Sequence, residues 1–347
     1  MKQLFAPVAF LLLASLVVLS AISERLFFLQ LAWIGSGLVV VFIFLKFDWR
    51  SFFNHRAVVW GLYALCVLLL VLVLAAPVIR NTKSWIVIGP LTFQPVELAK
   101  IVLILVFAQF FSKRHLAIAR WKTIITSFAL FALPAGLTLL QPDMGSASIL
   151  FGIWFGFLLV SGLPRRRLLT AALAFLVIGF LGWHFVLKDY QRQRIIGVFY
   201  PERNSLTMNY SVNQAKIAVG SAGFLGKGYK QGTQTQLGYL TEPSNDFILA
   251  ALVEEWGIAA GLLAIAAFIF LIFRILRIGL MATMNFEKFF CLGTAMVFGL
   301  QFLLNAGSTL GVFPVVGVTF PFLSYGGSSL LTDFSLLAII NAIAERY

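Results

Sequence analysis

The chain consists of long apolar runs separated by mostly short polar segments. Ten such runs can be read, at about residues 4–22, 27–45, 57–79, 95–111, 123–140, 145–163, 168–187, 247–273, 289–309 and 326–344. Most of them approach the ~20 apolar residues that a helix needs to cross a bilayer. The pattern predicts an all-α polytopic membrane protein of about ten transmembrane helices, built as a single transmembrane domain over residues 1–347.

The composition supports this class. Hydrophobic residues make up 61% of the chain and charged residues only 11%, and the mean hydropathy is +0.96. Soluble domains carry about 25% charged residues, so an ordinary soluble domain is excluded. Cys66 and Cys291 lie inside apolar runs without any spacing motif, and we expect them to be core residues rather than a disulfide or a metal pair. The first run lacks a persuasive small-residue cleavage site, so we expect a helix there rather than a signal peptide.

The net charge of +13 could indicate nucleic-acid binding, but the placement of the charges argues against it. If the N-terminus is cytoplasmic, most basic residues fall on the cytoplasmic side, as the positive-inside rule requires. We therefore expect both termini to be cytoplasmic in a bacterial inner membrane, and no nucleic-acid partner. The cytoplasmic residues are Lys2, Lys46, Arg50, Arg56, Lys113, Arg114, Arg120, Lys122, Arg165, Arg166, Arg167, Arg274, Arg277, Lys288 and Arg346.

One long polar segment, residues 188–246, separates the seventh and eighth runs and is expected outside the cytoplasm. It contains a helix-breaking stretch at 200–204, an apolar stretch at helical spacing over 210–222, and a glycine-rich piece over 223–238. Short amphipathic helices and glycine turns predict interfacial or re-entrant elements. Such backbone is tolerated only where protein or a water-filled cavity satisfies it, so a cavity open to the outer face is expected.

Asp246 is the first candidate for chemistry. Only 13 residues are acidic, yet Glu242, Asp246, Glu254 and Glu255 lie at or just below the start of the eighth run. A carboxylate at the edge of a bilayer is costly and by default marks a functional site.

The helical period distinguishes these acids. If a helix begins near Phe247, Asp246 shares a face with Ala250, Val253 and Gly257. These residues are small and would leave room for a substrate beneath the carboxylate. Glu254 and Glu255 point elsewhere and suit structural pairing.

A second candidate lies at the start of the fourth run. Pro95 suits the first turn of a helix, and Glu97 and Lys100 then share neighbouring parts of one face. Both fall in the outer half of the hydrocarbon, so Lys100 needs an acidic partner, either Glu97 or an acid from another helix. The pair could serve the site or could only hold helices together.

Two further segments leave alternatives open. Asp143, between the fifth and sixth runs, could act directly or could be the N-cap of the following helix. Residues 326–329 (GGSS) could offer backbone N–H groups to a phosphate at a helix N-terminus, or could simply form a tight turn.

Spacing alone does not choose among general base, metal ligand and proton relay for Asp246. His55 and His115 fall in cytoplasmic basic loops and His184 in a span, so a catalytic histidine is not expected. The sequence contains no order typical of a Ser-His-Asp triad, a cysteine nucleophile or a zinc site.

Four ordered segments resemble the SEDS (shape, elongation, division and sporulation) family. They are residues 83–100 (KSWIVIGPLTFQPVELAK), 141–147 (QPDMGSA), 210–228 together with 242–257, and 305–331 (NAGSTLGVFPVVGVTFPFLSYGGSSLL). The resemblance covers essentially the whole chain, and the lack of a long N-terminal tail favours the RodA branch over FtsW. The chain departs from the family pattern at two positions, with Asn245 where the family usually has Thr and Ser308 where it usually has Met. These departures affect the assignment to the RodA branch, and they remove no group that the chemistry needs.

The resemblance implies a peptidoglycan glycosyltransferase that polymerises lipid II at the outer face of the membrane during cell elongation and releases undecaprenyl pyrophosphate. The family's essential aspartate maps to Asp246, and its functionally sensitive Trp, Glu and Lys map to Trp85, Glu97 and Lys100. We expect Lys100 to be the counter-charge of Asp246. The candidate substrate-binding residues are Trp85, Gln94, Lys216, Ser324, Gly326, Gly327 and Ser328.

In the implied reaction, Asp246 is the general base for a sugar hydroxyl that attacks with inversion. The activated leaving group makes a second carboxylic acid unnecessary. The departing phosphates need positive charge, from Lys100, from basic residues of 188–230 or from a divalent cation (Mg²⁺ or Mn²⁺). The implied partners are lipid II, membrane lipids and a class B penicillin-binding protein that supplies transpeptidation.

Two other functions fit the sequence less well. A flippase of lipid-linked precursor would place acids near the bilayer midplane, whereas Glu97, Asp143, Glu242 and Asp246 cluster towards the outer edge. A non-catalytic scaffold that recruits a cell-wall synthase would leave these acids unexplained. The sequence therefore favours the enzyme.

Overall fold

The computed structural model describes residues 2–46, 49–79, 82–89, 91–113, 120–162, 164–185, 187, 189–200 and 209–346. Ten helices in these ranges follow the ten predicted apolar runs. They are α1 (Lys2–Ile22), α2 (Glu24–Lys46), α4 (Arg56–Leu72), α5 (Pro95–Ser112), α6 (Trp121–Leu140), α7 (Met144–Val160), α8 (Arg165–Phe185), α12 (Ile248–Met281), α13 (Asn285–Thr309) and α14 (Gly327–Ala344).

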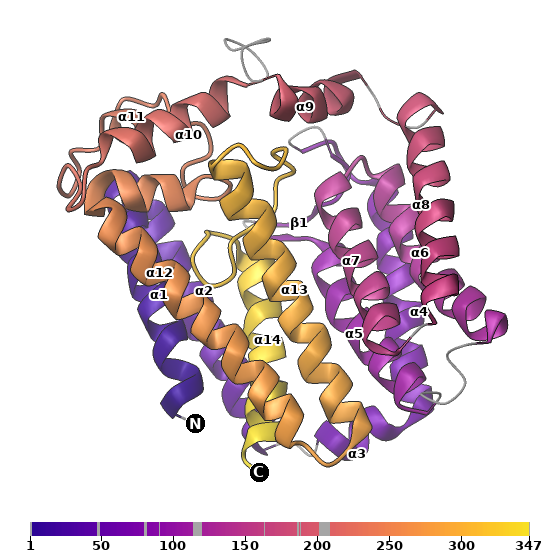
Figure 1. Cartoon of the computed structure of the whole chain (residues 1–347). Coiled ribbons are helices and arrows are strands. Elements are labelled where there is room, and N and C mark those ends of the chain that lie inside the picture. Colours follow the sequence, from indigo (N-terminus) through magenta and orange to yellow (C-terminus); the bar gives the residue numbers. More distant parts are fainter. Residues whose placement is uncertain are drawn as a thin grey trace.

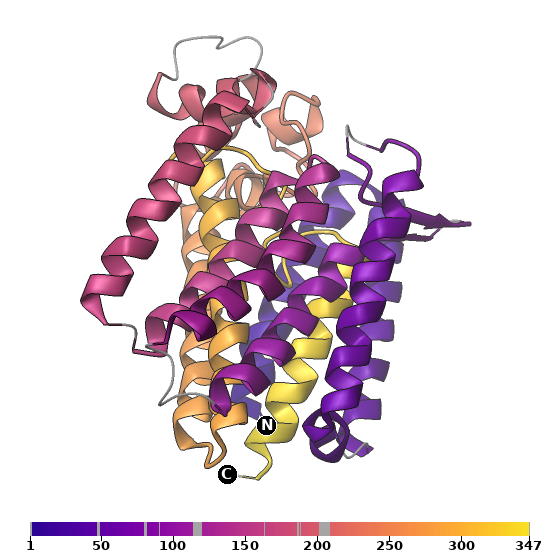
Figure 2. The same cartoon turned by 90° about the vertical axis from the view of Figure 1, so that its right-hand side faces the viewer.

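The long helices form one bundle, and shorter elements cover its ends. The helices α9 (Asp189–Phe199), α10 (Tyr210–Ser221) and α11 (Thr233–Gln236) lie across one end, here called the loop end (Figure 1). Both termini lie at the opposite end, here called the terminal end, near α3 (Trp49–Asn54). The view from the side shows the same separation (Figure 2). The short helices expected within 188–246 are therefore present.

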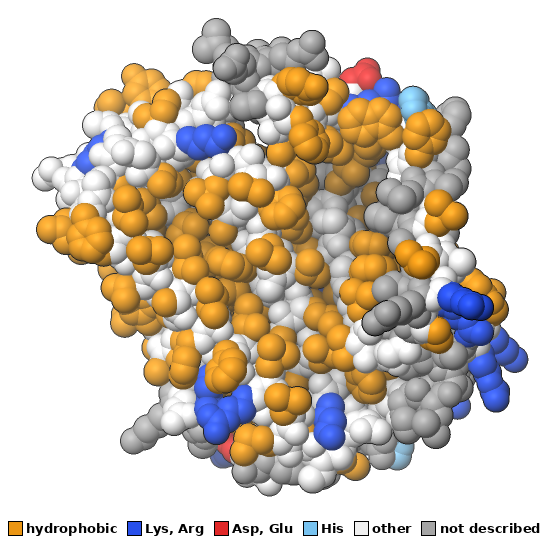
Figure 3. Space-filling view, in the orientation of Figure 1, with side chains coloured by type: hydrophobic (Ala, Val, Ile, Leu, Met, Phe, Trp, Pro, Cys, Tyr) orange, Lys and Arg blue, Asp and Glu red, His pale blue; other side chains and the backbone are white. Residues whose placement is uncertain are grey.

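The bundle has the surface of a membrane protein. Eight helices in the described ranges are long and apolar enough to cross a membrane, and α7, with 17 residues, is a shorter apolar helix. Large hydrophobic side chains such as Leu13, Phe28 and Ile125 are more than half exposed. Hydrophobic side chains cover the middle of the visible face, and Lys and Arg lie mostly in its lower part (Figure 3). The all-α polytopic membrane fold is confirmed.

Two helices lie deepest in the bundle. In both α5 and α14, 78% of the apolar window is buried, compared with 17% in α2. Helix α5 packs against α4, α13 and α7, and α14 packs against α2 and α5. Polar groups on α5 and α14 are therefore shielded from lipid and must find partners inside the protein.

Several predicted helix ends were wrong. In the run at 57–79, the α-helix ends at Leu72 and is followed by a short 3₁₀ turn, η1 (Val73–Ala75). Helical backbone stops there because Pro77 holds Ala76 extended (ψ 159°). The antiparallel strands β1 (Ile86–Ile88) and β2 (Leu91–Phe93) follow. Helix α12 continues to Met281 rather than ending near residue 273, because Arg274 and Arg277 end the apolar run but are good helix formers. The predicted break at 200–204 lies, apart from Tyr200, outside the described residues, as does His115.

Helix α12 is broken at Gly257. This residue has φ 83° and ψ 171°, which ends regular helical geometry within the 34-residue element. The glycine-rich loop packs against the break, where the N–H groups of Ile258 and Ala259 donate to the carbonyls of Gly223 and Phe224 at 3.1 and 3.2 Å. A Cβ at Gly257 would lie 2.2 Å from the Phe224 carbonyl oxygen. The break therefore requires glycine both for its φ and for the close approach.

We expect Gly257→Ala to destabilise the protein. The substitution forces a non-glycine residue into a rare backbone region, at about 1–3 kcal/mol, and adds the contact with the loop carbonyl. The thermal unfolding midpoint in detergent should fall clearly below that of the wild type. Gly220→Ala, in α10 with open space around its Cβ position, is the matched control and should not lower the midpoint. Equal midpoints for the two variants would contradict this account of the break.

Candidate functional site

Asp246 is held through its backbone. It is half-buried and lies two residues before the first residue of α12. Asn305, a buried residue of α13, directs its side-chain amide at three carbonyls, those of Asn245 (3.3 Å), Asp246 (3.1 Å) and Val318 (2.8 Å). One side chain thus ties the residue that precedes α12 to the segment between α13 and α14.

The segment before α14 provides a second support. The Ser324 hydroxyl donates to the carbonyl of Asn245 at 2.8 Å and accepts the N–H of Phe320 at 2.9 Å. The N–H of Tyr325 donates to the carbonyl of Ser244 at 2.9 Å. Ser324 was predicted to bind substrate, and the structure places its hydroxyl in these two contacts beside Asp246.

The helix face below Asp246 is filled. Ala250 is fully buried and Val253 is 6% exposed, and both belong to the hydrophobic core. Gly257, the last residue of the predicted face, is the break itself. The expected space for a substrate along this face is therefore wrong, because neighbouring helices pack against it. The helical period places residues on a face but does not show what covers that face.

Glu254 and Glu255 have structural roles, as predicted. The buried Glu254 carboxylate accepts the Lys227 ammonium at 2.9 Å and the N–H groups of Gln234 and Thr235 at 2.8 and 3.0 Å, at the start of α11. Glu255 accepts the Gln236 side chain at 2.9 Å. These contacts fix the glycine-rich loop against α12.

Lys100 is fully enclosed and paired with Glu97. Its ammonium lies 2.8 Å from Oε1 and 2.7 Å from Oε2 of Glu97, and the two residues are 2% and 5% exposed. Of the two partners left open by the sequence, Glu97 is therefore the one in contact. The ion pair joins residues one turn apart in α5. The pairing of Lys100 with Asp246 stays a prediction.

Two more acidic residues, Asp143 and Asp333, interact electrostatically with Lys100 without forming an ion pair with it among the described contacts. Asp333, on α14, is 1% exposed and was not among the predicted site residues. The available signal was its position as an acid inside an apolar run, a placement that is rare and usually functional.

Asp143 is the N-cap of α7. Its carboxylate accepts the N–H and hydroxyl of Ser146 at 3.0 and 2.8 Å, and the side-chain amide of Gln94 at 2.8 Å. Gln94 in turn stands at the N-cap position of α5, so this contact joins the starts of two helices. Burial raises the pKa of Asp143, while the bonds from Ser146, the charge of Lys100 and the bond from Gln94 act to lower it.

The remaining predicted residues lie around this region. Trp85 is half-buried and directly precedes β1. Gly326 is the N-cap position of α14, and Gly327 lies so close to the Trp33 ring that a Cβ there would be 2.2 Å from it. Ser328 is buried in the first turn of α14. Residues 327–329 therefore form the first turn of α14 rather than a separate tight turn, and their use as an anion site stays a prediction.

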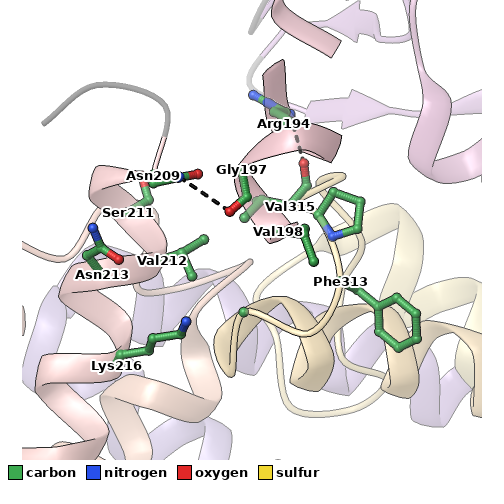
Figure 4. A pocket seen from close by; sticks show the side chains of 12 residues that line it. Arg194, Gly197, Val198, Asn209, Ser211, Val212, Asn213, Lys216, Phe313 and Val315 are labelled. Atoms are coloured by element: carbon green, nitrogen blue, oxygen red, sulfur yellow. Dashed lines mark hydrogen bonds between the residues drawn. The ribbon is translucent and has the colours of Figure 1, made fainter. Parts of the chain in front are cut away.

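Lys216 lines a pocket at the loop end. The pocket, of about 70 Å³, lies between α9, α10 and residues 311–315 (Figure 4). Lys216 covers Gly311, where a Cβ would lie 2.4 Å from its Nζ. Arg194, on α9, donates to the carbonyl of Val315 at 3.0 Å. The pocket thus combines an ammonium, a guanidinium and the side chains of Asn209 and Asn213.

In the described ranges, no three or more His, Cys, Asp or Glu residues are grouped to hold a metal ion. A divalent cation therefore remains a prediction from the resemblance. Both cysteines are buried thiols, as predicted.

The chain matches the family model FTSW_RODA_SPOVE, described as "Cell cycle protein", over residues 2–347. It is 34% identical to peptidoglycan glycosyltransferase MrdB of Escherichia coli K12, covering 98% of this chain and 92% of the relative. It is 33% identical to stage V sporulation protein E of Bacillus subtilis, covering 91% and 86%.

Solved structures agree with these relatives. One, described as "Structural coordination of polymerization and crosslinking by a peptidoglycan synthase complex", matches with a TM-score of 0.87 and 30% identity, covering 100% of this chain and 98% of that chain. The rod shape determining protein RodA of Thermus thermophilus matches with a TM-score of 0.75 and 28% identity, covering 99% and 96%. Sequence and fold point to one conclusion: the chain belongs to the FtsW, RodA and SpoVE family of cell cycle proteins.

Proposed function

We propose that this protein is a peptidoglycan glycosyltransferase that polymerises lipid II and releases undecaprenyl pyrophosphate. Relatives named peptidoglycan glycosyltransferase match nearly the whole chain, which supports the activity. The observation that carries the catalytic assignment is the placement of Asp246. It is a half-buried acid next to the first turn of α12, and the backbone around it is fixed by Asn305, Ser324 and Tyr325.

Asp246 is the general base in this proposal. Its carboxylate takes the proton of the acceptor sugar's 4-hydroxyl as the hydroxyl oxygen forms a bond to the anomeric carbon of the donor. The bond from that carbon to the diphosphate breaks, and the leaving group departs with the electron pair. A base in a fixed position contributes about 10²–10⁴ to the rate of such a step. Rigid backbone support suits this role because the base must stay within hydrogen-bond reach of the proton.

The leaving diphosphate needs positive charge, and the pocket with Lys216 and Arg194 supplies it. Both side chains are exposed at the loop end. Lys100, in contrast, is buried and paired with Glu97. We therefore assign the phosphate contact to Lys216, and to Glu97 and Lys100 the role of holding α5 in place beneath the site. Among the described residues, no carboxylate that would hold Mg²⁺ or Mn²⁺ lines the pocket, so no step is assigned to a divalent cation there.

The proposed location is the bacterial cytoplasmic membrane, with the loop end outside and both termini inside. Helices α12 and α13 meet at the terminal end (Figure 1), so Arg274, Arg277 and Lys288 belong to that end and support this orientation through the positive-inside rule. The proposed partner is a class B penicillin-binding protein. Its support is the similarity to a complex described as coordinating polymerization and crosslinking.

Asp246→Ala should abolish polymerisation. We expect the rate of glycan formation from lipid II by the purified protein to fall at least about a hundredfold, with and without the partner and a divalent cation. Glu242→Gln, an exposed acid in the same loop, is the matched control and should retain activity. If Asp246→Ala polymerises lipid II at the wild-type rate, Asp246 is not the general base. Lipid II transfer across vesicles without any glycan product from the wild type would favour a flippase instead.

Lys216→Ala should weaken substrate binding. Losing a charge-assisted contact to the diphosphate costs about 1.5–3 kcal/mol, so KM for lipid II should rise roughly tenfold or more. Lys230→Ala is the control, because it removes another lysine of the segment 188–246 that does not line the pocket. An unchanged KM in Lys216→Ala would place the phosphates elsewhere.

Lys100→Met should destabilise the fold by leaving the Glu97 carboxylate buried without its partner. Breaking a buried ion pair costs about 3–5 kcal/mol, so the unfolding midpoint in detergent should fall sharply. The double variant Lys100→Met with Glu97→Gln removes both charges and should recover most of the loss. If the double variant is no more stable than the single one, the pair does not act as a unit.

A further inference from the structure

Gln30 is a buried amide on a helix that otherwise faces lipid. Only 17% of the apolar window of α2 is buried, yet Gln30 is 0% exposed. The other buried residues of α2 are Gly37 and Val41, seven and eleven positions further along and so on the same face. A polar side chain on this narrow buried face must find its partners inside the protein, and the proposed mechanism does not use it.

The side-chain amide of Gln30 bridges two other parts of the chain. Its Nε2 atom lies 3.1 Å from the hydroxyl of Ser15, on α1, and 3.5 Å from the carbonyl oxygen of Ser324. The second bond is long, but a carbonyl oxygen only accepts, so it requires the nitrogen end of the amide to face Ser324. Among the described residues, no other donor reaches this carbonyl, and Oε1 of Gln30 has no partner. The structure therefore uses the donor end of this side chain.

Packing of α2 keeps Gln30 at this place. One turn after Gln30, the Trp33 ring packs against Gly327, and one turn further Gly37 packs against the Phe334 ring. Helices α2 and α14 are in direct contact along this face. The start of α14 and the segment before it are thus seated on α2, and the amide of Gln30 is held beside Ser324 by more than the hydrogen bond itself.

Ser324 links this contact to the backbone before Asp246. While its carbonyl accepts the Gln30 amide, its hydroxyl donates to the carbonyl of Asn245 at 2.8 Å and accepts the N–H of Phe320 at 2.9 Å. Hydrogen bonds therefore lead from Ser15 through Gln30 and Ser324 to the residue that precedes Asp246. A displacement of the Ser324 carbonyl would move the hydroxyl that holds Asn245.

We propose that Gln30 is a positioning residue for Asp246. Its amide, anchored on Ser15, fixes the carbonyl of Ser324, and the Ser324 hydroxyl transmits this position to Asn245. Gln30 acts through Ser324 and touches neither the substrate nor the reacting atoms. The catalytic consequence rests on the proposed function of Asp246, whereas the positioning itself does not.

The test variant is Gln30→Met, which keeps the length of the side chain and removes its donors. Gln109→Met is the matched control. Gln109 is 7% exposed on α5, and its side-chain amide donates to the carbonyl of Phe53, in α3, at 3.5 Å. It undergoes the same chemical change, with loss of a bond of the same length. Should Gln30→Met fail to fold, both measurements are made on Ser15→Ala, which keeps the glutamine and removes the anchor of its amide.

The first measurement is hydrogen–deuterium exchange of the full-length protein in detergent. In Gln30→Met, peptides over 319–326 and 243–247 should exchange at least about threefold faster than in the wild type, because their supporting contacts open locally. Gln109→Met should leave both peptides unchanged. Unchanged exchange in both peptides of Gln30→Met, or an increase spread evenly over the bundle, would overturn the proposal.

The second measurement is the rate of lipid II polymerisation. Gln30→Met should lower kcat about fivefold or more with KM within about twofold, because a small displacement of a catalytic group costs rate rather than binding. Gln109→Met should keep the wild-type kcat. A wild-type kcat in Gln30→Met, or a loss confined to KM, would overturn the catalytic consequence.

A double variant tests the route through Ser324. Ser324→Ala removes the hydroxyl that holds Asn245, so adding Gln30→Met to it should change kcat by no more than about twofold, since residues acting in one chain of contacts are not additive. If the two losses multiply, Gln30 does not act through Ser324 and the proposal fails. If the wild type forms no glycan, the proposed function fails, and hydrogen exchange alone decides the positioning.

Discussion

The ammonium of Lys100 is buried inside a bundle of apolar helices, where an uncompensated charge would cost several kcal/mol. Its compensation comes from Glu97, one turn earlier on α5, whose carboxylate lies 2.7 Å from the ammonium. Because this pair must stay enclosed by protein, α5 has to pack against α4, α7, α13 and α14.

The acid assigned to catalysis is held in a different way. Asp246 is half-buried, and donors from Asn305, Ser324 and Tyr325 hold its own carbonyl and those of the two preceding residues. These donors fix the backbone that carries the carboxylate. The residues that supply these donors come from α13 and from the segment before α14, so the long helices set the geometry of the site.

The loop end is attached to the bundle through the break in α12. Gly257 allows the glycine-rich loop to approach the helix closely enough for backbone hydrogen bonds, and Glu254 and Glu255 then cap and clamp the loop. The carboxylates of Glu254 and Glu255 therefore have a structural role in attaching the loop. The position of α10 follows from the same attachment, and with it the pocket lined by Lys216 and Arg194.

The sequence by itself determined the ten helices, the short helices of the long polar segment and the pairing roles of Glu254 and Glu255, because apolar runs and helical spacing are local properties. Its motifs also identified the family. Only the tertiary structure decided that Ala250 and Val253 are packed rather than open, that α12 breaks at Gly257, and that Lys100 pairs with Glu97 rather than with an acid from another helix. These features depend on which helix lies opposite, and the pattern along one segment carries no information about the segment that will cover it.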